Sequence, residues 1–131
     1  CQRLQLALHG SLQPAETSPR ACDCSFCQAH AAVWVSDPDG ELAVTTHDAE
    51  ALGRYRQGSE SAEFLMCRHC GVLLAVVFAT DDGMRGAVNV RCLANGGEFA
   101  PVQAVSPQQL PPEERRERWR RVWTSVRIEV G

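Results

Sequence analysis

The stretch CRHCGVLLAVVFA, residues 67–79, joins a cysteine pair to an apolar run. Cysteines separated by two residues, with glycine after the second, are typical of a zinc knuckle, because its tight turn favours a residue that accepts positive φ. The β-branched run at residues 72–79 is short for a helix and predicts a central strand. A redox Cys-x-x-Cys motif is the competing interpretation, but that motif normally opens a helix in a βαβ unit. The stretch therefore favours a β-rich fold with a metal-binding turn.

A second cysteine cluster precedes this stretch, at Cys22, Cys24 and Cys27. Small or polar residues separate the three sulfurs, so the backbone can bring them to one ion, and thiolate-rich tetrahedral coordination suits zinc. A disulfide such as Cys24 to Cys27, or simple burial of the thiols, is the alternative, but a disulfide leaves the third sulfur unexplained. A site with three protein ligands keeps one coordination position open for water or substrate.

Cys1 is the candidate partner of Cys67 and Cys70. Alternating leucines at residues 4–8 predict a strand, on which positions one and three face the same way, so Cys1 and Arg3 would lie side by side. A guanidinium does not ligate zinc, so this second site lacks a fourth thiolate. Completion by His69, His9, Cys92 or water stays open, as do an empty site and pairing of Cys67 and Cys70 with the first cluster.

The composition limits the class of protein. A chain of 131 residues, 44% of them hydrophobic, predicts one domain over residues 1–131. The longest apolar run is far shorter than the roughly 20 residues that span a bilayer, so no membrane partner is expected. With a net charge of −3, the chain as a whole lacks the positive charge expected of a protein that coats nucleic acid, so no nucleic-acid partner is expected. No basic-then-apolar leader is present, and we expect a cytoplasmic protein.

The remaining elements follow from turn signals and periodicity. Turn residues at 36–40 predict a hairpin between residues 31–36 and 41–45, and Asp81-Asp82-Gly83 predicts a second hairpin. Its returning strand contains Ala87, Val88 and Val90 and ends near Cys92. The helix is expected at residues 112–122, with proline first, glutamates early and arginines late. Residues 47–52 are expected to form a helical turn, and residues 125–130 a closing strand.

Four motifs occur in a specific order: Cys1-x-Arg3, Cys22-x-Cys24-Ser25-x-Cys27, Arg54-Tyr55 and Cys67-x-x-Cys70-Gly71. This order and spacing resembles the glutathione-dependent formaldehyde-activating enzyme family, whose relatives include the centromere protein V type. The resemblance runs from Cys1 to about Leu93. The arginine-rich helix beyond it is a local elaboration, whose basic side chains we interpret as a solvated face.

The resemblance implies a mainly β fold of stacked antiparallel sheets with zinc knuckles and one late helix, shared with methionine sulfoxide reductase B and Rab-accessory zinc proteins. It also implies one or two Zn²⁺ per chain. Cys22, Cys24 and Cys27 match the ligands of the catalytic zinc. Cys1, Cys67 and Cys70 match three of the four ligands of the structural zinc, and Arg3 stands where the fourth is expected.

The resemblance further implies condensation of glutathione with formaldehyde to S-hydroxymethylglutathione, a reaction of the carbon–sulfur lyase type. His30 is a candidate acid, base or hydrogen-bond donor beside the zinc thiolates. Arg54 and Arg56, two apart on a strand, are candidates to bind glutathione carboxylates. Cys92 is interpreted as a buried thiol, with redox catalysis as a weaker alternative. The rival hypothesis is a non-catalytic, zinc-stabilised binding module, favoured if the first zinc has a fourth protein ligand.

Overall fold

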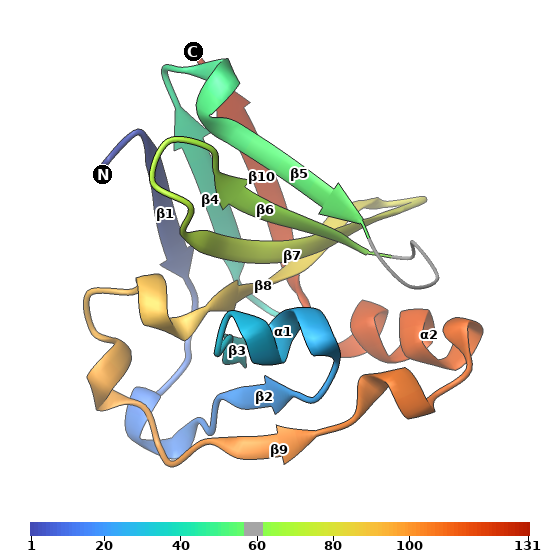
Figure 1. Ribbon diagram of the computed structural model, residues 1–131. Helices are drawn as coiled ribbons and strands as arrows, with labels where there is room; N and C mark the ends of the chain where they lie inside the picture. The colour runs from blue at the N-terminus through green and yellow to red at the C-terminus, as the bar shows by residue number, and fades with distance from the viewer. Residues whose placement is uncertain (57–61) are drawn as a thin grey trace.

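The computed structural model describes residues 1–56 and 62–131, and the strands of this part of the chain form one mixed sheet (Figure 1). The strand order is β1-β4-β10-β8-β3-β2-β9, and β7, β6 and β5 continue from β8. A mainly β fold with one main helix is therefore confirmed. The sheet is mixed rather than purely antiparallel, because β10 runs parallel to β4 and β2 runs parallel to β9.

The helices and strands occur largely in the predicted order along the chain. The helices are α1 Ser25–Ala29 and α2 Pro112–Val122. The strands are β1 Leu4–His9, β2 Arg20–Cys22, β3 Trp34–Val35, β4 Glu41–Thr46, β5 Leu52–Arg56, β6 Glu63–Cys67, β7 Leu73–Thr80, β8 Gly83–Asn89, β9 Gln103–Val105 and β10 Thr124–Val130. The expected turn at residues 47–52 contains a 3₁₀ helix at Ala49–Ala51.

Strand β8 joins the two halves of the sheet. One edge of β8 pairs with β7, and this confirms the hairpin predicted at Asp81-Asp82-Gly83. The other edge pairs with β10 at Gly86 and with β3 at Asn89. Gly86 also permits the close approach of β7, since a Cβ there would lie 2.5 Å from the carbonyl oxygen of Val76. The strand ends at Asn89, and residues 90–92 form a 3₁₀ turn.

The hairpin expected between residues 31–36 and 41–45 is wrong. Strand β4 pairs with β1 and β10, whereas β3 pairs with β2 and β8. The turn between them is nevertheless well made, because the buried Asp37 carboxylate accepts hydrogen bonds from the backbone N–H groups of Ser11 at 2.8 Å and Asp39 at 3.0 Å. The turn therefore redirects the chain into another part of the sheet instead of returning it alongside.

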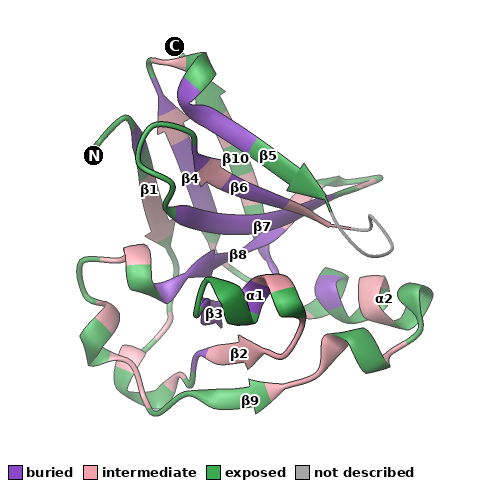
Figure 2. Cartoon of the chain, viewed as in Figure 1, coloured by how far each residue is buried: buried purple, intermediate pink, exposed green. Residues whose placement is uncertain are grey.

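An aromatic cluster attaches α2 to the sheet. Trp119 and Trp123 are buried, and their rings stack with centroids 4.4 Å apart. Phe78 of β7 meets both rings edge-on, at 5.4 and 5.5 Å. Figure 2 shows the rest of α2 exposed or half-buried, which agrees with a helix that has one buried face and a solvated basic face. This packing holds α2 against the part of the sheet that β7 and β8 form.

Asn89 is expected to be important for stability. Its side-chain oxygen accepts hydrogen bonds from the N–H groups of Val33 and Arg91, and its amide donates to the carbonyl of Leu73 at 2.9 Å. Asn89→Ala should therefore lower the free energy of unfolding by about 2–3 kcal/mol, measured by urea denaturation, because buried backbone groups lose their partners. Asn95→Ala, on an exposed turn, should stay within about 0.5 kcal/mol. Equal losses in both variants would contradict this role.

Candidate metal centres and the cavity beside them

The first cysteine cluster is built where β2 leads into α1. Cys22 ends β2, Cys24 caps the N-terminus of α1, and Cys27 lies within the helix. The Cys24 sulfur accepts a hydrogen bond from the backbone N–H of Cys27 at 3.4 Å. All three sulfurs lie within 4.8 Å of one another. The predicted convergence of these cysteines is therefore confirmed, although the short helix that produces it has no apolar periodicity to predict it.

The three thiols of this cluster are electrostatically unequal. A hydrogen bond from the Cys27 side chain lowers the pKa of Cys22 to about 6, against the opposing effect of burial. The same hydrogen bond, together with burial, raises the pKa of Cys27. One sulfur of the cluster is thus a thiolate near neutral pH, held by a neighbouring thiol that donates to it. Such a partly ionised group of thiols loses its remaining protons when a metal binds.

The donor set of the first cluster fits zinc. Thiolates on a tetrahedral zinc lie about 3.8 Å apart, and the sulfurs here need only small movements to reach that spacing. Within residues 1–56 and 62–131, no fourth His, Cys, Asp or Glu joins the group. His30, the candidate acid or base, is exposed, and its ring packs on Phe26 with centroids 4.6 Å apart. The arrangement therefore matches a three-ligand site rather than a closed one.

The second cluster brings Cys1 to the knuckle at the end of β6. The Cys1 and Cys67 sulfurs are 3.6 Å apart, and Cys70 completes a group within 4.8 Å. The knuckle is closed by hydrogen bonds from the Cys67 N–H to the Val72 carbonyl and from the Gly71 N–H to the Cys67 carbonyl. Gly71 has φ +80°, as the motif predicts. The backbone N–H of Val72 lowers the pKa of Cys70. Cys67 and Cys70 therefore group with Cys1 and not with the first cluster.

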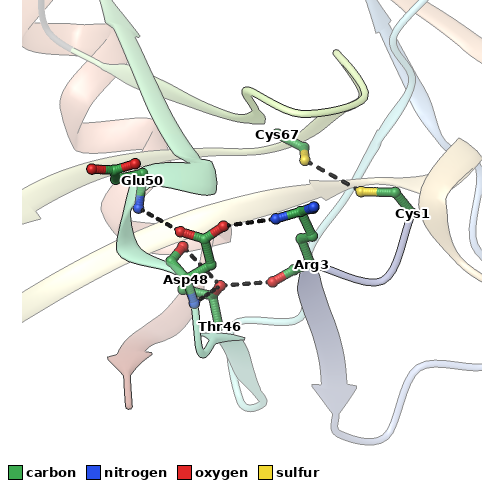
Figure 3. Close-up of polar contacts among 6 residues, drawn as sticks. All are labelled: Cys1, Arg3, Thr46, Asp48, Glu50 and Cys67. Carbon is green, nitrogen blue, oxygen red and sulfur yellow. Dashed lines mark hydrogen bonds and ion pairs between the residues drawn. The ribbon is translucent and has the colours of Figure 1, made fainter.

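Arg3 takes no part in the second cluster. Strand β1 begins only at Leu4, and Gln2 has φ 69°, so Cys1 and Arg3 do not face the same way along a strand as expected. The Arg3 guanidinium donates to the Asp48 carboxylate at 3.0 Å, and its carbonyl accepts from the Thr46 hydroxyl (Figure 3). Arg3 therefore contacts residues at the C-terminal end of β4. The charge of Arg3 is balanced by Asp48 rather than directed at the sulfurs.

Cys92 lies apart from both groups. All seven cysteines are within the described residues, and all are free thiols. The half-buried Cys92 thiol donates a hydrogen bond to the Leu73 carbonyl at 3.0 Å. Burial, with a smaller effect of Cys70, raises the pKa of Cys92. These features agree with a packed thiol, since a nucleophilic cysteine needs a lowered pKa.

A cavity of about 450 Å³ opens directly on the first cluster. Its volume is within the range of small-molecule sites. The sulfurs of the cluster lie at one part of its wall, and Trp34, Phe64, Trp119 and Trp123 form much of the rest. Three arginines also line it: Arg20 of β2, and Arg115 and Arg118 of α2. Sequence analysis missed these arginines as site residues, because no motif contains them and only the fold brings β2 and α2 together.

Residues 105–110 form a further wall of this cavity. The Asp23 carboxylate accepts hydrogen bonds from the Ser106 hydroxyl and from the Gln108 amide, the latter at 3.1 Å. Arg115 donates to the carbonyls of Pro107 and Leu110 at 3.1 and 3.0 Å. Asp23, which lies between two cysteines of the cluster, and Arg115 of α2 therefore hold the same wall in place. Asp23 acts here as a structural hydrogen-bond acceptor.

Arg54 and Arg56 lie outside the lining of this cavity. Both pair with Glu63 of the neighbouring strand β6, at 2.7 and 3.4 Å. The prediction that they share one face of a strand is therefore confirmed. Their role as glutathione ligands stays a prediction, and the positive charges beside the first cluster come from other arginines.

This chain is similar to the crystal structure of a protein from Rhodobacter sphaeroides, a structural genomics target. It is 25% identical, with a TM-score of 0.54, and the match covers 79% of this chain and 96% of that chain. No family model matches the chain, and no curated protein matches it. The likeness supports the fold and carries no statement about activity. Within the described residues, no helix is long and apolar enough to cross a membrane.

Proposed function

We propose that this chain is a zinc-dependent protein of the carbon–sulfur lyase type, acting on an adduct of a thiol such as glutathione with an aldehyde such as formaldehyde. The observation that supports it is the position of the cavity. Cys22, Cys24 and Cys27, a group of three thiols, line a cavity large enough for a small molecule. The resemblance to the glutathione-dependent formaldehyde-activating enzymes, carried by the motifs, points to the same chemistry.

Cys22, Cys24 and Cys27 would hold the metal of this site. When bound, zinc lowers the pKa of a substrate thiol and so favours its nucleophilic thiolate near neutral pH. The aromatic walls of the cavity would displace water around a bound substrate, and the wall held by Asp23 and Arg115 would limit where the substrate can lie.

The reaction itself is balanced without an oxidant or a reductant. The thiol sulfur forms a bond to the aldehyde carbon, the carbonyl π bond breaks, and the proton lost from sulfur ends on oxygen. The reverse reaction cleaves the same carbon–sulfur bond. The demand on the protein is therefore to orient a thiol against an aldehyde and to exclude water, which is what a cavity beside a thiol cluster provides.

Millimolar glutathione should raise the Tm of the zinc-loaded protein by about 4 °C, because a ligand at ten times its Kd stabilises by roughly 1.4 kcal/mol. S-methylglutathione, whose sulfur has no proton to lose, should have a smaller effect. Exchange spectroscopy with ¹³C-formaldehyde should then show faster formation of S-hydroxymethylglutathione with protein than without it. Full zinc loading with neither a thermal shift nor faster exchange would reject this function in favour of a zinc-stabilised binding module.

A further inference from the structure

Two arginines of the cavity have no acidic partner in the described part of the chain. Arg20 of β2 is largely screened from water and donates to the Ser36 hydroxyl at 2.8 Å, while Arg118 extends from α2. The ion pairs among the described residues all use other arginines. The nearby Asp23 carboxylate instead accepts from Ser106 and Gln108. No Asp or Glu is among the described residues that line the cavity.

These arginines leave a positive charge that nothing in the described cavity balances. Arg20 and Arg118 both line the same cavity, so their two guanidinium groups face one confined space. Two like charges at the wall of one cavity are stabilised by an anion placed between them. An arginine fork is well suited to a carboxylate, which it binds through parallel N–H···O bonds.

The rest of the cavity selects for an apolar group. All three tryptophans of the chain line it, together with Phe64. Trp34 lies near Phe64, with ring centroids 6.2 Å apart, and Trp119 stacks on Trp123. Flat aromatic walls of this kind bind the face of a ring or an alkyl chain. Glutathione has two carboxylates, an ammonium group and no apolar side chain, so it matches these walls less well than a more apolar acid.

We propose that the cavity binds an organic anion with an apolar body, its carboxylate on Arg20 and Arg118 and its body against the tryptophans. This rests on the proposed function in one respect: the thiol of the natural substrate would then belong to this class, with its sulfur toward Cys22, Cys24 and Cys27. Binding of the anion itself requires no carbon–sulfur chemistry. The occupant is thus defined by two features, one negative charge and one apolar group.

The test uses the zinc-loaded full chain and two thiol-free probes, 3-phenylpropanoate and the uncharged 3-phenylpropanamide. Tryptophan fluorescence follows binding directly, because every tryptophan lines the cavity. We expect the acid to bind about tenfold more tightly than the amide, as for one charge-assisted hydrogen-bonded pair. Equal affinity of acid and amide, or no binding of the acid, would overturn the proposal.

Arg118→Gln should remove the preference for the acid, so that both probes bind this variant alike. Arg118 is exposed and pairs with no described residue, so the variant should keep its fold, whereas Arg20→Gln would also break the bond to Ser36. Arg121→Gln is the matched control, since Arg121 is exposed on the same helix outside the cavity lining. It should keep the preference, and an equal loss in both variants would indicate general charge attraction and overturn the site.

The same measurements separate this inference from the proposed function. Preference for the acid without any catalysed exchange of glutathione and formaldehyde would keep the anion site and reject the lyase activity. Catalysed exchange without preference for the acid would keep the activity and reject the anion site. A third probe, 2-mercapto-3-phenylpropanoate, should bind more tightly than 3-phenylpropanoate only if the thiol reaches the zinc at the first cluster.

Discussion

Cys22→Ser is expected to reduce the zinc bound to the purified protein by one equivalent per chain and to abolish carbon–sulfur exchange. Serine replaces a sulfur that lies within 4.8 Å of both Cys24 and Cys27, so the cluster falls from three thiolate ligands to two. Two thiolates hold zinc far more weakly than three. Loss of activity should exceed the roughly 10–100-fold that follows removal of a hydrogen-bond partner of a metal ligand.

Cys92→Ser is the matched control for this variant. Cys22 and Cys92 are both half-buried, and each makes hydrogen bonds to neighbouring groups, so serine disturbs packing similarly at the two positions. Cys92 belongs to neither metal group. Zinc content measured by plasma emission, and exchange measured by NMR, should be unchanged in Cys92→Ser. Equal zinc in both variants would mean that the first cluster holds no ion.

Much of the local fold follows from the sequence because local chemistry decides it. Helix α2 has the expected bounds, since Pro112, early glutamates and late arginines are all signals within the segment itself. The β7–β8 hairpin is decided by adjacent residues in the same way. Strand pairing over long distances is different. Strand β4 lies between β1 and β10 because Leu42 and Val44 enter the core there, which no signal near residues 36–40 encodes.

The same contrast holds at the site. The cysteine groups follow from spacing, because three ligands within a few residues converge almost independently of the rest of the fold. The cavity wall does not follow, since Arg20 and Arg118 are far apart in sequence and line one cavity only when Trp119 and Trp123 pack α2 against Phe78 of the sheet. Most arginines on α2 lie on a solvated face of the helix, as predicted. Arg115 and Arg118 also line the cavity, and only the tertiary arrangement shows this.

We expect the second cluster to bind zinc, and the removal of that zinc to cost more stability than any change at the surface. This cluster joins Cys1 to Cys67 and Cys70, and so links the entry to β1 with the turn between β6 and β7. A metal link between distant residues restricts the unfolded chain, and zinc affinity adds directly to folding free energy. At a free zinc concentration about 1,000 times Kd the gain is roughly 4 kcal/mol. The Tm should therefore fall by about 10–20 °C when zinc is chelated.

Cys70→Ser separates the contribution of the metal from that of packing. Cys70 is exposed, so serine should leave the packing of the core intact. We expect a low Tm for this variant with zinc present, and a Tm close to that of the unchanged protein once both are chelated. Calorimetric scans of both proteins, each with and without zinc, give four Tm values. The contribution of the metal is the loss of Tm caused by Cys70→Ser with zinc minus the loss caused without zinc. If the substitution lowered Tm equally with and without zinc, the second cluster would be a packed group of thiols rather than a metal link.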